Sequence, residues 1–244
     1  MPDQAQSELP KPLTIGMVLF PTFTLLDLAG PHAALSMHGQ THLLWKTLEP
    51  VWTDTGISIN PTTTFADAPA EFDVLFVPGG PGTAEAMLDQ EIVDFLARTA
   101  PSARYVTSVC TGSLLLGKAG LLDGYRVATH WAFYDALEAL GVETSADRVV
   151  VDRNRYTGGG VTAGIDFGLT LLAALRGEDT AKFTQLAMEY DPKPPFSAGH
   201  PRTADAQIVA AARGATGEML QQFVDAAKAP RHPTPGPTSA SAAA

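Results

Sequence analysis

The sequence predicts an α/β protein in which a mainly parallel β-sheet is covered by helices on both faces. Short apolar segments of strand length alternate with longer segments of helical character along most of the chain, as expected for parallel strands joined by helices. The strand segments are apolar without alternation, which is typical of strands buried on both faces. Apolar residues make up 45% of the 244 residues, enough to fill a sizeable core.

Strands are expected where short apolar segments stand between turn-forming residues. These segments are 13–20, 42–48, 73–77, 104–109 and 126–128. Hairpins are predicted where β-branched residues flank polar turns, at 51–65 around Asp54 to Gly56 and at 149–157 around Asp152 and Asn154.

Helices are expected between and after these strands. The first, 28–37, follows Asp27 as a candidate N-cap. The others cover 85–98, 111–118, 131–140, 163–175, 179–189 and 204–227. Neither a repeat nor a strong linker interrupts residues 13–228, so we expect one domain there. We also expect a polar, Pro-rich disordered lead at 1–12 and a Pro-, Ala- and Ser-rich disordered tail at 229–244.

The composition argues against several classes of function. The formal net charge is −10 and the 16 basic residues are scattered, whereas nucleic-acid binding needs clustered Lys and Arg. A single cysteine excludes an intrachain disulfide and fits a reducing compartment. No segment approaches the ~20 apolar residues that span a bilayer, and the N-terminus lacks the pattern of a signal peptide. We therefore expect a soluble, cytoplasmic protein that binds neither nucleic acid nor membrane.

Cys110 is the strongest candidate for a reactive group. It stands between the apolar strand 104–109 and a helical segment that begins Thr-Gly-Ser. A sharp strand-to-helix turn of this kind, a nucleophile elbow, presents its side chain at the carboxyl edge of the sheet. The helix N-terminus would favour the thiolate over the thiol. A lone cysteine is commonly a small buried hydrophobe instead, but the Thr-Gly-Ser sequence favours the elbow.

Two further features follow core strands and are expected near Cys110, because ligands of open α/β sheets bind at the carboxyl ends of the strands. Asp27 follows the first strand and could exchange a proton with the thiol and then with a substrate; the alternative is a helix cap. The Pro-Gly-Gly-Pro-Gly segment at 78–82 follows the third core strand. Its Gly79 and Gly80 would let backbone N–H groups approach a ligand, and the alternative is a tight turn.

Thr111, His130 and Trp131 complete the candidate site. The Thr111 N–H is a natural donor to developing negative charge, and its hydroxyl could orient a carboxylate. His130 and Trp131 follow a strand and are candidate substrate contacts, although a cap or core role is as common for the histidine and core packing is more common for the tryptophan. No histidine has metal-ligand spacing with Cys or carboxylates. Asp166, on an apolar helix, is expected to be a structural hydrogen-bonding carboxylate.

Four strings carry a family resemblance: Leu-Asp-Leu-Ala-Gly-Pro at Asp27, Phe-Val-Pro-Gly-Gly-Pro-Gly at Gly79, Ser-Val-Cys-Thr-Gly-Ser at Cys110 and Ala-Thr-His-Trp at His130. They resemble the ThiJ/PfpI superfamily over residues 13–228. The Val-Cys-Thr-Gly motif and the segments 158–167 and 189–196 are similar to its isocyanide (isonitrile) hydratase branch. The resemblance implies a flavodoxin-like sandwich, a homodimer and a nucleophilic Cys110 on a strained elbow, with Asp27 as its acidic partner. Thr111 replaces the histidine of the family's proteases, which argues against peptidase activity.

The reaction that the resemblance implies is hydration of an isocyanide to an N-substituted formamide. The Cys110 thiolate would add to the isocyanide carbon, and Asp27 would supply a proton and later act as base for the water that attacks the thioimidate. The N–H groups of Gly80 and Thr111 would position substrate or water, and the Thr111 hydroxyl would orient Asp27. Neither a metal nor an organic cofactor is needed.

Two other functions remain open for the same fold. Some transcriptional regulators carry it ahead of a helix-turn-helix domain, but only about 16 residues follow the last predicted helix, too few for such a domain. A redox sensor or stress protein that uses oxidation of Cys110 is the second alternative, and a low-pKa thiol at a helix start would support it. The Pro-rich loop at 192–201 is either a lid or a dimer contact.

Overall fold

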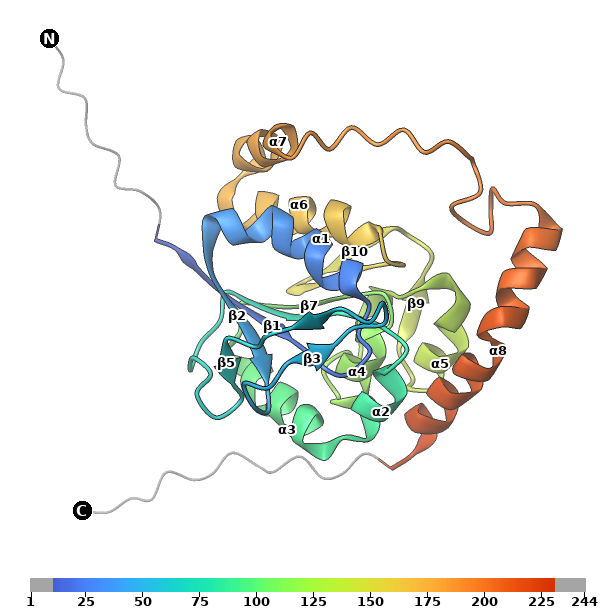
Figure 1. Ribbon diagram of the computed structural model, residues 1–244, viewed down its shortest axis with the longest axis horizontal. Helices are drawn as coiled ribbons and strands as arrows, with labels where there is room; N and C mark the ends of the chain where they lie inside the picture. The colour runs from blue at the N-terminus through green and yellow to red at the C-terminus, as the bar shows by residue number, and fades with distance from the viewer. Residues whose placement is uncertain (1–10, 231–244) are drawn as a thin grey trace, which may run out of the picture.

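A computed structural model of the protein describes residues 11–230 (Figure 1). Residues 1–10 and 231–244, which make up most of the predicted lead and tail, lie outside the described residues. Within 11–230, strands and helices alternate as the sequence predicts, and the α/β fold class is confirmed.

The core is a seven-stranded sheet in the order β10-β11-β7-β6-β1-β2-β5. All neighbours pair in parallel except β10, which runs antiparallel to β11 at one edge. The strands are β1 (Leu13–Val18), β2 (Gly39–Trp45), β5 (Thr63–Thr64), β6 (Val74–Val77), β7 (Tyr105–Val109), β10 (Val149–Asp152) and β11 (Arg155–Gly158). The adjacent strands β7, β6 and β1 are almost wholly buried, because helices cover them on both sides.

Helices cover both faces of this sheet, as predicted (Figure 1). On one face α1 packs against α6, and α6 contacts α7. On the other face lie α2, α3 and α4, and the long α8 packs against α5 and α2. Their bounds are α1 (Leu25–Leu35), α2 (Thr83–Leu88), α3 (Gln90–Thr99), α4 (Gly112–Lys118), α5 (Tyr134–Glu138), α6 (Ala163–Arg176), α7 (Glu178–Ala187) and α8 (Ala206–Lys228). No helix within 11–230 is both long enough and apolar enough to cross a bilayer.

Two of the predicted strand regions have a different arrangement from the prediction. The hairpin expected over 51–65 is shorter, with β3 (Val51–Trp52) pairing antiparallel to β4 (Ser58–Ile59) while the following β5 joins the main sheet. The strand expected at 126–128 is present as β8 (Arg126–Ala128), but it pairs with β9 (Glu143–Ser145) in a separate two-stranded sheet. Three residues were too few to show which sheet this strand would join.

Three of the predicted helices differ from the prediction. The helix expected over 131–140 is a 3-10 turn (Trp131–Phe133) followed by the short α5 (Tyr134–Glu138). The first predicted helix begins at Leu25 with Thr24 as its N-cap, so Asp27 lies in its first turn and the cap role for Asp27 is wrong. The helix expected over 85–98 is divided at Asp89, whose extended backbone ends α2 and whose side chain accepts the N–H of Glu91 to cap α3.

The sheet order positions the candidate site. Because β7, β6 and β1 are neighbours and parallel, their carboxyl ends meet at one edge. The first turn of α1, the loop after β6 and the residue after β7 therefore lie together there, although they are far apart in the sequence.

Candidate active site

Cys110 occupies a sharp turn between β7 and α4. Its φ is +53°, a left-handed conformation that is uncommon for a residue with a side chain and that the surroundings must hold in place. The Cys110 N–H donates to the carbonyl oxygens of Gly159 at 2.7 Å and Gly158 at 3.1 Å, and its carbonyl accepts from the hydroxyls of Thr129 at 2.9 Å and Ser113 at 3.1 Å. This geometry is the strained nucleophile elbow that was predicted.

The Asp27 side chain lies fully buried beside this elbow. Its Oδ2 accepts the backbone N–H of Gly79 at 2.9 Å, whereas its Oδ1 has no hydrogen-bond partner among the described residues. The carboxyl is close enough to the Cys110 thiol that each group alters the pKa of the other. The structure thus brings together the predicted thiol and carboxylate, which hydrogen-bond to each other.

Burial dominates the protonation of this pair. Loss of hydration raises the pKa of Asp27 from 3.8 to about 7, because a buried site disfavours the charged form. Burial and the neighbouring charge of Asp27 likewise raise the pKa of Cys110 well above its ordinary value, against the lowering effect of hydrogen bonds from the N–H groups of Val161 and Thr111. The helix start contributes a donor, as expected, but burial and Asp27 raise the pKa of the thiol more than the two N–H groups lower it.

The Thr111 hydroxyl ties the elbow to the loop after β6. It accepts the N–H of Gly80 at 2.9 Å and lies 2.8 Å from the hydroxyl of Thr83, both buried. It does not orient Asp27 as expected, because the Gly79 N–H takes that place. The N–H groups of Gly79 and Gly80 are thus both bonded to side chains of the site.

Gly79 is required by the closeness of this loop to the elbow. A Cβ at Gly79 would lie 2.4 Å from the Thr111 nitrogen and 2.9 Å from the Cys110 Cβ, distances that no side chain tolerates. The neighbouring Gly80 has a φ of +150°, a conformation that L-residues rarely adopt. The glycines therefore allow the loop to approach Cys110 closely enough for its N–H groups to bond to Asp27 and Thr111.

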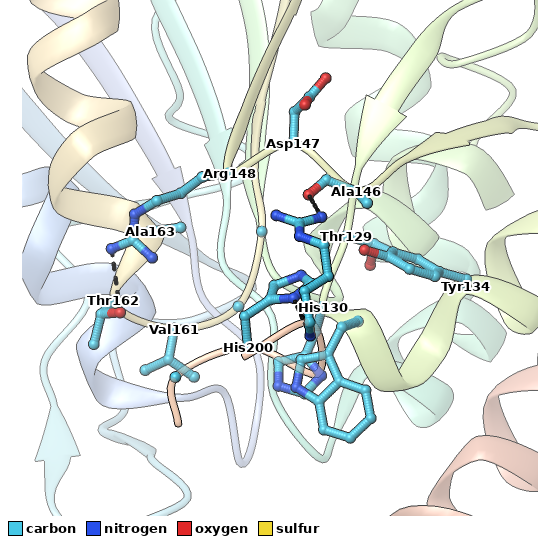
Figure 2. Close-up of a pocket in the computed structure, with 15 residues that line it drawn as sticks. Thr129, His130, Tyr134, Ala146, Asp147, Arg148, Val161, Thr162, Ala163 and His200 are labelled. Carbon is cyan, nitrogen blue, oxygen red and sulfur yellow. Dashed lines mark hydrogen bonds between the residues drawn. The ribbon is translucent and has the colours of Figure 1, made fainter. Parts of the chain in front are cut away.

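A cavity of about 340 Å³ lies next to the elbow (Figure 2), lined by residues that contact Cys110 rather than by Cys110 or Asp27 themselves. Three residues that line it, Thr129, Gly159 and Val161, hydrogen-bond to Cys110. Figure 2 shows His130 and Tyr134 on one side of the cavity and the turn from Val161 to Ala163 on the other. Gly199 and His200, in the Pro-rich loop, and Arg202, directly after it, also line the cavity.

His130 and Trp131 both line this cavity. His130 also caps a short 3-10 turn, accepting the N–H of Ala132 at its Nδ1, and burial lowers the pKa of His130 to about 4, so its ring is neutral near pH 7. Trp131 also packs against the hydrophobic core, and the Arg213 guanidinium of α8 lies 5.4 Å from the centre of its ring.

Val161 is the site residue that sequence reasoning missed. It has a φ of +23° and directs its N–H to the Cys110 sulfur. The signal is the preceding Gly158-Gly159-Gly160 run, which by itself predicts only a tight loop. Asp166 has the structural role expected of it, accepting hydrogen bonds from Arg148 and Tyr190. Within residues 11–230, no group of three His, Cys, Asp or Glu side chains is arranged to hold a metal ion.

Comparison with known proteins agrees with this geometry. The sequence profile of the DJ-1/PfpI family matches residues 14–174. Isonitrile hydratase from Pseudomonas putida is 53% identical over 203 residues, which cover 82% of this chain and 89% of that protein. The crystal structure of a ThiJ/PfpI family protein from Pseudomonas syringae has a TM-score of 0.88 and 43% identity, with 93% of this chain and 97% of that one covered.

A transcriptional regulator is also related. The HTH-type transcriptional regulator GbdR from Pseudomonas aeruginosa is 36% identical over 178 residues, which cover 69% of this chain but 48% of the regulator. The relatives of this chain thus include both an enzyme and a longer transcriptional regulator. The profile match over most of the chain, together with the 53% identical relative, establishes that the chain belongs to the DJ-1/PfpI family.

Proposed function

We propose that this protein is an isocyanide hydratase that adds water to an isocyanide and releases an N-substituted formamide. The observation that carries the proposal is the buried pair of Cys110 and Asp27, in which the carboxyl interacts with the thiol and its Oδ2 accepts the Gly79 N–H. The 53% identity to the isonitrile hydratase of Pseudomonas putida supports the same activity.

In the first step, Asp27 takes the proton of the Cys110 thiol and the sulfur attacks the terminal carbon of the isocyanide. One S–C bond forms, and Asp27 returns the proton to that carbon, which gives a thioimidate. A carboxylate with a pKa near 7 suits this exchange, because an acid–base group works best when its pKa lies near the working pH. The N–H groups of Val161 and Thr111 at the sulfur stabilise the transient thiolate.

In the second step, water attacks the thioimidate carbon and Asp27 accepts one of its protons. The other water proton ends on nitrogen, the C–S bond breaks, and the thiolate leaves as the formamide forms. Asp27 then returns its proton to sulfur, so that one water molecule is consumed and no cofactor takes part. The cavity beside Val161 and His130 would hold the N-substituent, with Trp131 as one of its apolar walls.

We also infer the setting in which this enzyme works. The exposed hydrophobic side chains Leu26, Trp52 and Ile57 lie on α1 and the adjoining β3–β4 hairpin, as expected for a surface buried in a homodimer. A single free cysteine in the site suits the reducing cytoplasm. The acidic net charge of −10 does not suit a nucleic-acid or anionic membrane partner.

The test is hydration of an aryl and an alkyl isocyanide by the freshly reduced protein. We expect loss of the isocyanide C≡N stretch and appearance of the formamide with wild type, and no turnover above background with Cys110→Ala. Acid quenching during turnover should leave an adduct with the mass of the whole isocyanide on Cys110, which is the sole cysteine. A fully active Cys110→Ala variant would rule out the covalent mechanism.

The redox-sensor alternative is less well supported by the site. Cys110 is only 5% exposed and its pKa is raised, whereas redox-sensing cysteines are exposed and acidic. Absence of turnover by the reduced wild-type protein, combined with rapid oxidation of Cys110 by dilute peroxide, would favour this alternative.

A further inference from the structure

Three side chains hold the turn between β11 and α6 from outside, and we call them the Arg148 clamp: Arg148, Asp166 and Tyr190. Arg148 donates from Nε to Asp166 Oδ2 at 2.6 Å and from Nη2 to the hydroxyl of Thr162 at 3.3 Å. The Tyr190 hydroxyl donates to the same Asp166 oxygen at 3.1 Å. Figure 2 shows Arg148 bonded to Thr162 at the edge of the cavity. The clamp therefore fixes the first turn of α6.

Val161 lies between two points that Arg148 holds. On one side, the Arg148 carbonyl accepts the N–H of Gly159 at 2.9 Å; on the other, its guanidinium bonds to Thr162. Val161 itself has a φ of +23°, which is strained for a β-branched residue and persists only where neighbouring contacts enforce it. Thr111 and Val161 both donate an N–H to the Cys110 sulfur, and Val161 does so from outside the elbow.

We propose that the Arg148 clamp is a positioning device for the nucleophile, which keeps the strained Val161 peptide turned so that its N–H stays on the Cys110 sulfur. The clamp then stabilises the thiolate that forms when Asp27 takes the thiol proton. This inference deepens the proposed function and rests on it for the reaction, but not for the ionisation of the thiol.

Because the clamp is exposed, a role in positioning Val161 can be distinguished from a role in the stability of the fold. The Arg148 and Asp166 side chains are 52% and 34% exposed, and ion pairs of this kind add little to stability because solvent screens them. Loss of the clamp should therefore leave the unfolding midpoint nearly unchanged and should alter the acidity of Cys110 instead.

The test is a titration of Cys110 by its thiolate absorbance near 240 nm, with the Cys110→Ala protein subtracted. Because the charge of Asp27 raises the pKa of Cys110, the titration is run in an Asp27→Asn background, where that contribution is removed. Asp166→Asn is the decisive variant. Its loss of negative charge alone would increase the thiolate fraction, whereas loss of positioning should decrease it by about three- to tenfold at a fixed pH.

Arg148→Lys is the second variant, because it keeps the positive charge but lacks the two-pronged geometry that reaches both Asp166 and Thr162. It should also decrease the thiolate fraction. The matched control is Arg126→Gln, which breaks the comparably exposed Arg126–Asp147 pair (3.2 Å) without touching the turn and should leave the titration unchanged. An unchanged or larger thiolate fraction in Asp166→Asn would overturn the proposal.

With Asp27 intact, the clamp variants should lower kcat for isocyanide hydration and change KM little, because Val161 N–H acts on the sulfur. If the wild-type protein hydrates no isocyanide, the proposed function fails, while the titration still decides whether the clamp positions Val161. A change in KM in the clamp variants without any change in the titration would assign the clamp to substrate binding and contradict the inference.

Discussion

At the residue scale, Cys110 and Asp27 form a buried pair that holds one proton once the pH is above the Asp27 pKa of about 7. Burial raises the pKa of both groups, to about 7 for Asp27 and well above the ordinary value for Cys110. Two adjacent buried negative charges are costly, so the site resists loss of its second proton. One shared proton is what the proposed reaction needs, since Asp27 must take it from sulfur and deliver it to carbon.

The same burial makes Asp27 a pH-dependent cost to folding. Its pKa is about 7 in the folded protein and near 3.8 when unfolded, so the stabilising effect of its proton is full below about pH 4 and is lost as pH rises through 7. Asp27→Asn should therefore be more stable than wild type at pH 8. The difference in unfolding free energy should grow by roughly 2–3 kcal/mol between pH 5 and pH 8.

Urea unfolding of both proteins at the two pH values measures this difference. Asp94→Asn is a suitable control, because the half-buried Asp94 hydrogen-bonds to the Gln90 amide within α3. A difference between Asp27→Asn and wild type that does not change with pH would mean that Asp27 ionises normally in the folded protein.

At the scale of elements, the site depends on the close approach of the loop after β6 to the elbow after β7. Gly79→Ala would place a Cβ 2.4 Å from the Thr111 nitrogen, so the loop would have to move and the N–H bond to Asp27 would be lost. We expect at least 2 kcal/mol of destabilisation, at the upper end of ~1–3 kcal/mol for overpacking, and loss of most hydratase activity. The same substitution at Gly214, exposed on α8 where an added Cβ would meet open space, should stabilise by up to about 1 kcal/mol. Thermal unfolding of the two variants should shift in opposite directions.

The elements that sequence predicted well were those with a strong local signal. The strands 13–20, 73–77 and 104–109 and the helix 163–175 are present within a few residues of their predicted ends, because each is a mainly apolar segment bounded by turn-forming or charged residues. The elbow was predictable for the same reason. The placement of β8 in its own small sheet depends on β9, a partner of three residues that has no distinct pattern.

Site details that depend on long-range geometry were not predictable. The Thr111 hydroxyl bonds to Gly80 rather than Asp27 because of how closely the loop after β6 approaches. The raised pKa of Cys110 follows from its depth in the core and from Asp27, neither of which the helix start alone reveals. Val161 acts through its backbone N–H, so its side chain carried no signal of its role.

At the scale of the whole molecule, α8 is anchored to the helix that follows the nucleophile. Lys118, the last residue of α4, is 5% exposed, and its ammonium donates to the carbonyls of Ala226 at 2.7 Å and Ala229 at 2.6 Å. Those carbonyls lie at the C-terminus of α8, where a cation is stabilising because the helix dipole is negative there. The buried lysine thus connects the elbow helix to the element that also packs on α2 and α5.

Removal of this ammonium should loosen α8 more than the loss of an exposed ion pair would. Lys118→Met keeps most of the aliphatic volume but leaves the Ala226 carbonyl without its donor, and we expect a loss of about 1–3 kcal/mol in unfolding free energy. Lys182→Met removes the exposed Lys182–Glu178 pair on α7 (3.1 Å) and should change stability by less than about 0.5 kcal/mol. Native-state hydrogen exchange should show faster exchange in α8 for Lys118→Met only. If both variants exchanged alike, the packing of Phe223 against Phe133 and its neighbours would suffice to hold α8, and Lys118 would merely be tolerated in its buried position.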